Sequence, residues 1–126
     1  MKIPENLKYT ENHEWVLFEG LIATIGITDY AQTELGDIVY IDIDTAGTIL
    51  NIDEIFGSVE AVKTVSDLFM PIAGKVLQFN DKLEKTPELV NQAPYTDGWM
   101  IKVEIDQSIT NDKLLSAKQY KAAIGL

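Results

Sequence analysis

The sequence predicts a mostly β fold, arranged as a sandwich or a flattened barrel, and two observations support this. Most of the first two thirds of the chain consists of short strand-like runs, such as "DIVYIDID", in which apolar and polar residues alternate. Turn-forming residues separate these runs at intervals of about 8 to 12 residues, a spacing typical of sandwiches and barrels. The length of 126 residues suits one domain spanning residues 1–126.

The strand-like runs follow one another in a clear order. The first is expected from about Glu14 to Phe18 and ends before Gly20, and "LIATIGI" and "DIVYIDID" follow it. "TAGTILNIDE" is expected to be a loop with a short extended piece, and Ser58–Gly74 contains two further runs. "GKVLQFND" and "WMIKVEID" supply the last strands. Between them, "KLEKTPELVNQAPYTDG" is expected to be a loop with one helical turn at Pro87–Leu89.

Short accessory helices and a C-terminal helix are expected beside the strands. In "TDYAQTELG", Thr28 can cap the first turn of a helix and Gly36 can end it. In the last segment, apolar residues recur at helical spacing, so that Thr110 or Asn111 would cap a helix and Gly125 would end it.

The charge balance excludes some classes of partner. Twenty acidic residues face ten basic ones, all of them lysine, which gives a net charge of −10. Nucleic-acid binding is not expected, because it requires a basic face and uses arginine as its usual base reader. An acidic surface suits a protein that docks on basic faces of partner proteins. No apolar run approaches the roughly 18 residues that span a bilayer, and no signal peptide is recognised, so a cytoplasmic protein is expected.

The chain has few residues suited to catalysis. It contains no cysteine, one histidine (His13), and neither of the common glycine-rich nucleotide-binding motifs. His13 is therefore expected to be structural or incidental, and Trp15 and Trp99 are expected to lie in the core. Gly74 is expected in a turn that needs a positive φ. If the protein takes part in chemistry, a cofactor or a partner must supply the catalyst.

A lone lysine lies between the two strand-like runs of "SVEAVKTVSDLFMPIAG". Lys63 stands where a tight hairpin must reverse, and its neighbours Val62 and Thr64 are β-branched and therefore stiff. Glu60 and Asp67 add acidic groups on either side. A hairpin tip presents a long amine to other enzymes, although an ordinary exposed lysine is the simplest alternative.

Five blocks of the sequence resemble the H protein of the glycine cleavage system. They are "LKYTENHEWV", "ATIGITDYAQTELGDIVYI", "EAVKTVSDLFMPIAG", "ELVNQAPYTDGWMIKV" and "LLSAKQY", in the family's order. The third resembles the family's lipoylation site, although Ala61 and Thr64 stand where Ser and Ala are usual. The resemblance implies a barrel-sandwich hybrid of the biotinyl/lipoyl-carrier type, with lipoic acid attached to Lys63 in amide linkage.

The resemblance also implies partners and a role in one-carbon metabolism. The arm on Lys63 would take an aminomethyl group from the pyridoxal-phosphate-dependent glycine decarboxylase to the tetrahydrofolate-dependent aminomethyltransferase. Dihydrolipoamide dehydrogenase would reoxidise it, and a lipoate ligase or lipoyl transferase would attach it. The chain itself would be a carrier and not an enzyme, and a monomer is expected because a shuttle presents one arm to several partners.

Two acids at matching motif positions, Glu14 and Asp67, are expected to contact the loaded arm. In family members the arm carries a protonated amine and folds into a surface cleft, where carboxylates stabilise the ammonium group. The alternative for Glu14 is an ordinary exposed acid on the first strand.

Other readings of the Lys63 pattern differ in class. A biotin carrier has methionine on both sides of its lysine, and lipoyl domains of 2-oxo acid dehydrogenase acyltransferases are shorter and typically show D-K-A. An H-like protein that relays lipoate to other enzymes would share the whole pattern. An unmodified acidic interaction module would leave Lys63 without an attached group.

Overall fold

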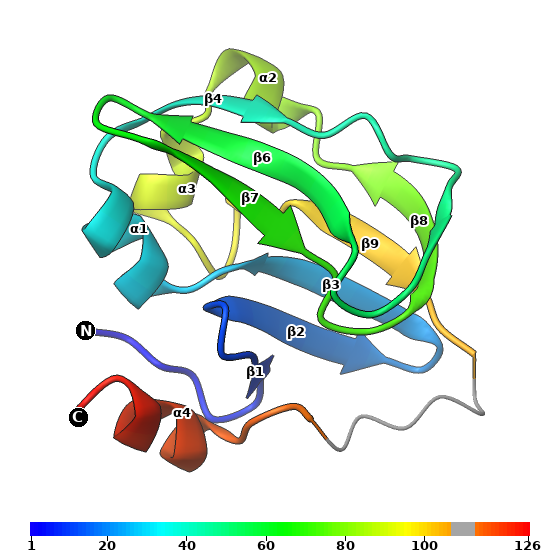
Figure 1. The fold of residues 1–126 in the computed structure, drawn as a ribbon, viewed down its shortest axis with the longest axis horizontal. Coiled ribbons are helices and arrows are strands. Elements are labelled where there is room, and N and C mark those ends of the chain that lie inside the picture. Colours follow the sequence, from blue (N-terminus) through cyan, green and yellow to red (C-terminus); the bar gives the residue numbers. More distant parts are fainter. Residues whose placement is uncertain (107–112) are drawn as a thin grey trace.

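The computed structural model describes residues 1–106 and 113–126, and within them two antiparallel sheets face each other (Figure 1). The larger sheet consists, in spatial order, of β1 (Lys8–Tyr9), β2 (Glu14–Glu19), β3 (Ile22–Ile27), β9 (Ile101–Glu104), β8 (Gly74–Phe79) and β5 (Ile49–Leu50). The smaller sheet consists of β4 (Ile38–Asp42), β6 (Ile55–Ala61) and β7 (Val65–Phe69). This arrangement confirms the predicted β-sandwich class.

The main hydrophobic core lies between the two sheets. It is formed by side chains that point inward from both sheets. Examples that are fully buried are Ile25 and Val103 in the larger sheet and Phe56 and Val59 in the smaller one. Burial of one face explains the alternating sequence pattern of strands such as β6 and β9, whereas β3 is buried on both faces.

Helix α1 (Asp29–Leu35) follows β3 and has the predicted ends. The Thr28 side chain accepts a hydrogen bond from the Ala31 amide, and Gly36 ends the helix at φ 78°. Both predictions are confirmed, because capping depends on local residue types.

The segment expected to be a loop with one helical turn contains two short helices, α2 (Lys82–Lys85) and α3 (Leu89–Gln92). Their buried residues Leu83 and Val90 pack into the main core. The sequence did not predict α2, because its one buried residue, Leu83, gives no periodic signal. Of the described helices, none is long and apolar enough to cross a membrane.

The C-terminal helix α4 (Ala117–Ala123) begins later than predicted. Ser116 is its N-cap and forms a capping box with Gln119, a stronger start signal than a threonine or asparagine alone. The predicted caps, Thr110 and Asn111, lie outside the described residues. Leu115 precedes the helix and pairs with Tyr9 in an isolated β-bridge. Gly125 follows the helix with φ 84°, as predicted.

A second hydrophobic cluster lies on the other side of β2, where α4 and the N-terminal segment cover the sheet. Trp15, Tyr9 and Tyr120 are its largest buried side chains, and the rings of Tyr9 and Tyr120 stack with their centroids 4.7 Å apart. Trp15 is therefore a core residue, as predicted. Trp99 is only partly buried against this cluster, and the Lys102 Nζ atom lies 5.1 Å from its ring centroid.

The prediction for Gly74 is wrong. Gly74 is the first residue of β8, is paired with Leu50, and does not have a positive φ. A Cβ atom at this position would lie 2.5 Å from the Glu104 carbonyl oxygen and 2.5 Å from the Val103 Cγ1 atom. Glycine is present because β9 approaches the backbone closely, and not because a turn requires it.

Gly74→Ala is expected to lower the free energy of unfolding by about 1–3 kcal/mol, because the added methyl group overlaps β9 backbone. Urea unfolding of the purified variant measures this loss. Lys75→Ala, at the exposed neighbouring position, serves as the control and is expected to stay within about 0.5 kcal/mol of the parent. Equal stability of the two variants would contradict the steric explanation.

Candidate functional site

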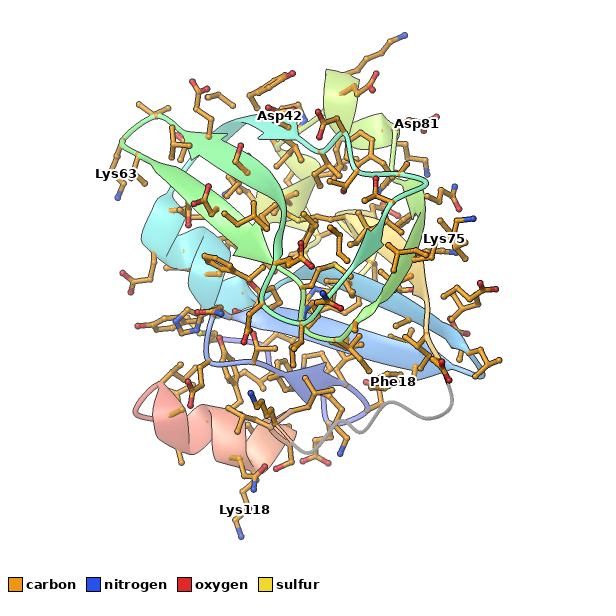
Figure 2. All side chains as sticks on the ribbon, turned by 45° about the vertical axis from the view of Figure 1, so that its right-hand side comes forward. Phe18, Asp42, Lys63, Lys75, Asp81 and Lys118 are labelled. Atoms are coloured by element: carbon orange, nitrogen blue, oxygen red, sulfur yellow. The ribbon has the colours of Figure 1, made fainter. Side chains whose placement is uncertain are left out.

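Lys63 lies at the tip of the hairpin formed by β6 and β7. The paired strands end at Glu60 and Val65, and the Ala61 amide donates to the Thr64 carbonyl at 2.8 Å. The Val62 amide donates to the Asp37 carbonyl at 3.0 Å, which ties the tip to the segment after α1. Figure 2 shows Lys63 at this outer end of the hairpin, beside α1. The hairpin is where the sequence predicted it.

The aliphatic part of the Lys63 side chain passes close to Gly36, at the end of α1. A Cβ atom at Gly36 would lie 3.1 Å from the Lys63 Cε atom and 3.6 Å from its Nζ atom. Gly36 therefore ends the helix and also leaves room for the lysine. The sequence predicted the first role only, because a contact across 27 residues has no local signal.

A cleft of about 210 Å³ opens beside the hairpin, between β7, α1 and the start of β2. Apolar side chains line part of it, among them Ile27, Leu35 and Val59, while Glu14, Glu34 and Asp67 contribute acidic groups. The cleft is thus partly apolar and negatively charged.

Glu14 is almost fully buried, with 1% of its surface exposed, so the interpretation as an ordinary exposed acid is wrong. Its Oε1 atom accepts a hydrogen bond from the Thr10 hydroxyl at 2.7 Å, and its Oε2 atom accepts from the Phe69 amide at 3.4 Å. Burial raises the pKa of Glu14 from 4.5 to about 7, with a smaller raising effect from Asp53, while the two hydrogen bonds oppose the rise. Glu14 can therefore gain or lose a proton near neutral pH.

Asp67 lies on β7 and is exposed at the edge of the same cleft. It also lines a neighbouring hollow of about 240 Å³ together with Asp42 and Asp44. The structure thus brings Glu14 and Asp67, which belong to different sheets, to one cleft. Whether they bind a loaded arm stays a prediction.

His13 lines the cleft as well, and its neighbours hold it in place. Its Nδ1 atom lies 2.9 Å from the Tyr120 hydroxyl, and its ring centroid is 4.9 Å from that of Tyr30. Burial lowers the pKa of His13, which favours the neutral imidazole. Its backbone has φ 67°. The sequence did not indicate the partner Tyr120, which is 107 positions away.

The outer surface of the smaller sheet near Lys63 combines apolar and acidic groups; we call it the hairpin face. Tyr40, Val62 and Val65 are 53%, 73% and 63% exposed, and the sheet register places Glu60 between Tyr40 and Val65. Strands β4, β6 and β7 contain no lysine. This face therefore suits a partner surface that is basic around an apolar centre.

Comparisons with known proteins agree with this arrangement. A family model described as "Glycine cleavage H-protein" matches residues 7–125. Proteins named "Glycine cleavage system H protein" from Bacteroides thetaiotaomicron and Bacteroides fragilis are 53% and 52% identical over 124 residues, which cover 98% of this chain and 98% of each relative. The crystal structure of a glycine cleavage system H protein from Mycobacterium marinum superposes with a TM-score of 0.89 at 32% identity, covering 98% of this chain and 100% of that one. The chain belongs to the glycine cleavage H-protein family.

Proposed function

We propose that the protein is the lipoyl-carrying shuttle of a glycine cleavage system and that Lys63 carries lipoic acid in amide linkage. The observation that supports this most directly is an exposed lysine at the tip of a stiff hairpin, beside a cleft that contains acidic groups. Membership in the H-protein family supports a carrier role in the same reaction system. The chain's own residues would then bind and orient an arm and present it to partner enzymes.

The residues around Lys63 fit such an arm in length and chemistry. Four residues lead from Lys63 to Asp67, the last three of them in β7, which is about 13 Å along an extended chain. A lysine joined to a lipoyl group contains about as many consecutive bonds as four residues of extended main chain, which reach about 14 Å. Apolar walls near the hairpin suit a hydrocarbon arm, and the acids lie near the far end of that reach.

When bound, the lipoyl group supplies a disulfide that is opened as it accepts an aminomethyl group. Glu14 and Asp67 would hold the protonated amine of that group. A cation close to Glu14 favours its ionised form, so that binding of the amine opposes the effect of burial on the pKa of this carboxyl. The half-closed cleft would also limit access of water to the amine.

Three enzymes would use the arm in turn: the glycine decarboxylase, the aminomethyltransferase and dihydrolipoamide dehydrogenase. A lipoate ligase or lipoyl transferase would attach it. Tethering raises the effective concentration of the group at each enzyme, so that tight docking is not needed. The hairpin face would supply brief, salt-sensitive contacts to basic partner surfaces. A monomer in the cytoplasm suits this role, and both named relatives are bacterial.

The test is an intact mass spectrum after incubation with a lipoate ligase, lipoate and ATP. The parent protein is expected to gain one lipoyl group, and Lys63→Arg is expected to gain none. Lys75→Arg is the matched control, because Lys75 is also exposed and lies on β8, far from the hairpin tip (Figure 2). A gain in Lys63→Arg would place the modification elsewhere, and no gain in the parent would favour an unmodified interaction module.

A lipoyl-donor role would give the same mass result, so a second measurement separates it from the shuttle. The lipoylated protein is mixed with the three glycine cleavage enzymes, glycine, tetrahydrofolate and NAD, and NADH formation is followed. A shuttle supports turnover. A donor that only relays lipoate does not.

A further inference from the structure

The backbone between β1 and β2 forms a closed turn that begins at Thr10 and ends at Glu14. The Thr10 amide donates to the Glu14 carbonyl at 3.0 Å, and the His13 amide donates to the Thr10 carbonyl at 3.1 Å. His13 takes a left-handed conformation inside this turn. The turn fixes where the Glu14 side chain leaves the backbone.

The Thr10 side chain makes two contacts with Glu14. Its hydroxyl donates to the Glu14 Oε1 atom at 2.7 Å and accepts from the Glu14 amide at 3.2 Å. Because the hydroxyl oxygen already accepts the amide proton, its own proton is directed to the carboxylate. The other donor to Glu14, the Phe69 amide, is more distant at 3.4 Å from Oε2. The Thr10 hydroxyl is therefore the closer of the two donors.

We propose that Thr10 is a positioning residue of the arm cleft: its hydroxyl holds the Glu14 carboxylate in one orientation, with the remaining acceptor sites open to the cleft. A nearly buried carboxylate needs donors to stay ionised, and the ammonium group of a loaded arm would complete its set. The effect of this inference on a loaded arm rests on the proposed function. The contact between Thr10 and Glu14 does not depend on it.

Other charged and titratable groups also act on this carboxyl from the surrounding elements. Asp53 lies close enough to disfavour its ionised form, and the Glu14 charge in turn affects Tyr120. The remaining groups share the cleft with Glu14 and belong to the turn before β2, α1 and β7: His13, Glu34 and Asp67. A variant that changes only the Thr10 hydroxyl leaves all of these in place.

Thr10→Val and Thr10→Ser separate the hydroxyl from the shape of the side chain. Valine keeps the branched shape and removes the donor, and serine keeps the donor. Thr10→Val is expected to increase the proton affinity of the Glu14 carboxyl about tenfold, which raises its pKa, because a hydrogen bond to the charged form is lost. Thr10→Ser is expected to titrate like the parent. A residue that served folding alone would not give this rescue by serine.

The experiment has two readouts. The first is an NMR titration of the Glu14 carboxyl carbon in the unlipoylated parent, Thr10→Val and Thr10→Ser. The second uses the lipoylated proteins with the arm reduced and loaded with an aminomethyl group, and measures its hydrolysis to ammonia and formaldehyde between pH 6 and 8. Thr10→Val is expected to shorten the half-life of the loaded arm several-fold. The pH dependence of this hydrolysis is expected to shift to higher pH, as the titration of Glu14 does.

The two readouts distinguish two kinds of failure. If Glu14 titrates identically in the parent and in Thr10→Val, the positioning role of Thr10 is wrong, whatever the arm does. If Glu14 titrates differently but the hydrolysis rate is unchanged, also in Glu14→Gln, the cleft does not hold the loaded amine. That second result would overturn the arm-binding part of the proposed function, whereas lipoylation of Lys63 would still stand on its mass spectrum.

Discussion

The Glu14 carboxyl is expected to lower the free energy of unfolding of the unmodified protein by about 3 kcal/mol as the pH rises from 4.5 to about 7. The folded-state pKa of this acid is raised, because burial disfavours the charged form. Between the two pKa values the folded protein keeps the proton and the unfolded chain has lost it. Stability therefore falls as the pH rises through this window, and above it the loss is complete.

Glu14→Gln separates the effect of Glu14 on the pH dependence of stability from the effect of His13, which has the opposite sign. Burial lowers the pKa of His13, so its contribution to stability is lost as the pH falls through 6.5 toward the lower folded value. At pH 8, Glu14→Gln is expected to be more stable than the parent by up to about 3 kcal/mol, and near pH 4.5 the two are expected to converge.

Urea unfolding at pH 4.5, 6 and 8 measures these differences. Glu19→Gln is the matched control, because it makes the same change at the exposed end of the same strand. It is expected to follow the parent at each pH. Parallel stability curves for the parent and Glu14→Gln would show that the buried carboxyl has no unusual titration.

A carboxyl group that lowers the stability of the fold at neutral pH is best explained by a role in the cleft that it lines. Groups that cost stability are found where function needs them, since neutral replacements are readily available. A glutamine at this position would keep the shape of Glu14 and remove the cost of burying a charge. It would also remove the anion that faces the cleft, which the proposed function requires.

The strands and the hairpin could be predicted from the sequence because local patterns determine them. Alternation reveals a strand whenever one face is buried, as it does for Ile101 and Val103 in β9. In β4 a bulge after Ile38 interrupts the alternation, so that Ile38 and Ile41, three positions apart, are both buried. Thr28 and Gly36 marked both ends of α1, because capping needs residue types only. The two strand-like runs that flank Lys63, together with its β-branched neighbours, indicated a hairpin tip, which is also a local pattern.

The burial of Glu14 was the main feature that the sequence did not settle. Along β2, Glu14 lies on the same face as Val16, which belongs to the main core, while Trp15 points to the second cluster. Read with period two, this face already indicated that the acid points inward. The prediction left the question open because a buried acid is rare and its donors come from Thr10 and from Phe69, 55 positions away.

Tyr120→Ala is expected to produce a large loss of stability, about 3–5 kcal/mol. Tyr120 is fully buried in α4, stacks on Tyr9, and is a major part of the second hydrophobic cluster. Removal of its ring leaves a cavity between α4 and β1. Thermal or urea unfolding measures the loss, and Lys118→Ala, at an exposed position of the same helix (Figure 2), is expected to change little.

Tyr120→Phe separates the ring from its hydroxyl and connects α4 to the cleft. The hydroxyl lies 2.8 Å from the Thr28 Oγ1 atom and 2.9 Å from the His13 Nδ1 atom, so its loss is expected to cost about 1–3 kcal/mol by leaving these groups with unmet hydrogen bonds. Thr28 caps α1, and His13 lines the cleft. The hydrogen bonds that hold the hairpin tip, from Ala61 to Thr64 and from Val62 to Asp37, involve neither group. Lys63 is therefore expected to be lipoylated at the parent rate in Tyr120→Phe, while hydrolysis of a loaded arm becomes faster. If both rates stay at the parent value although stability falls, α4 supports the fold without shaping the cleft.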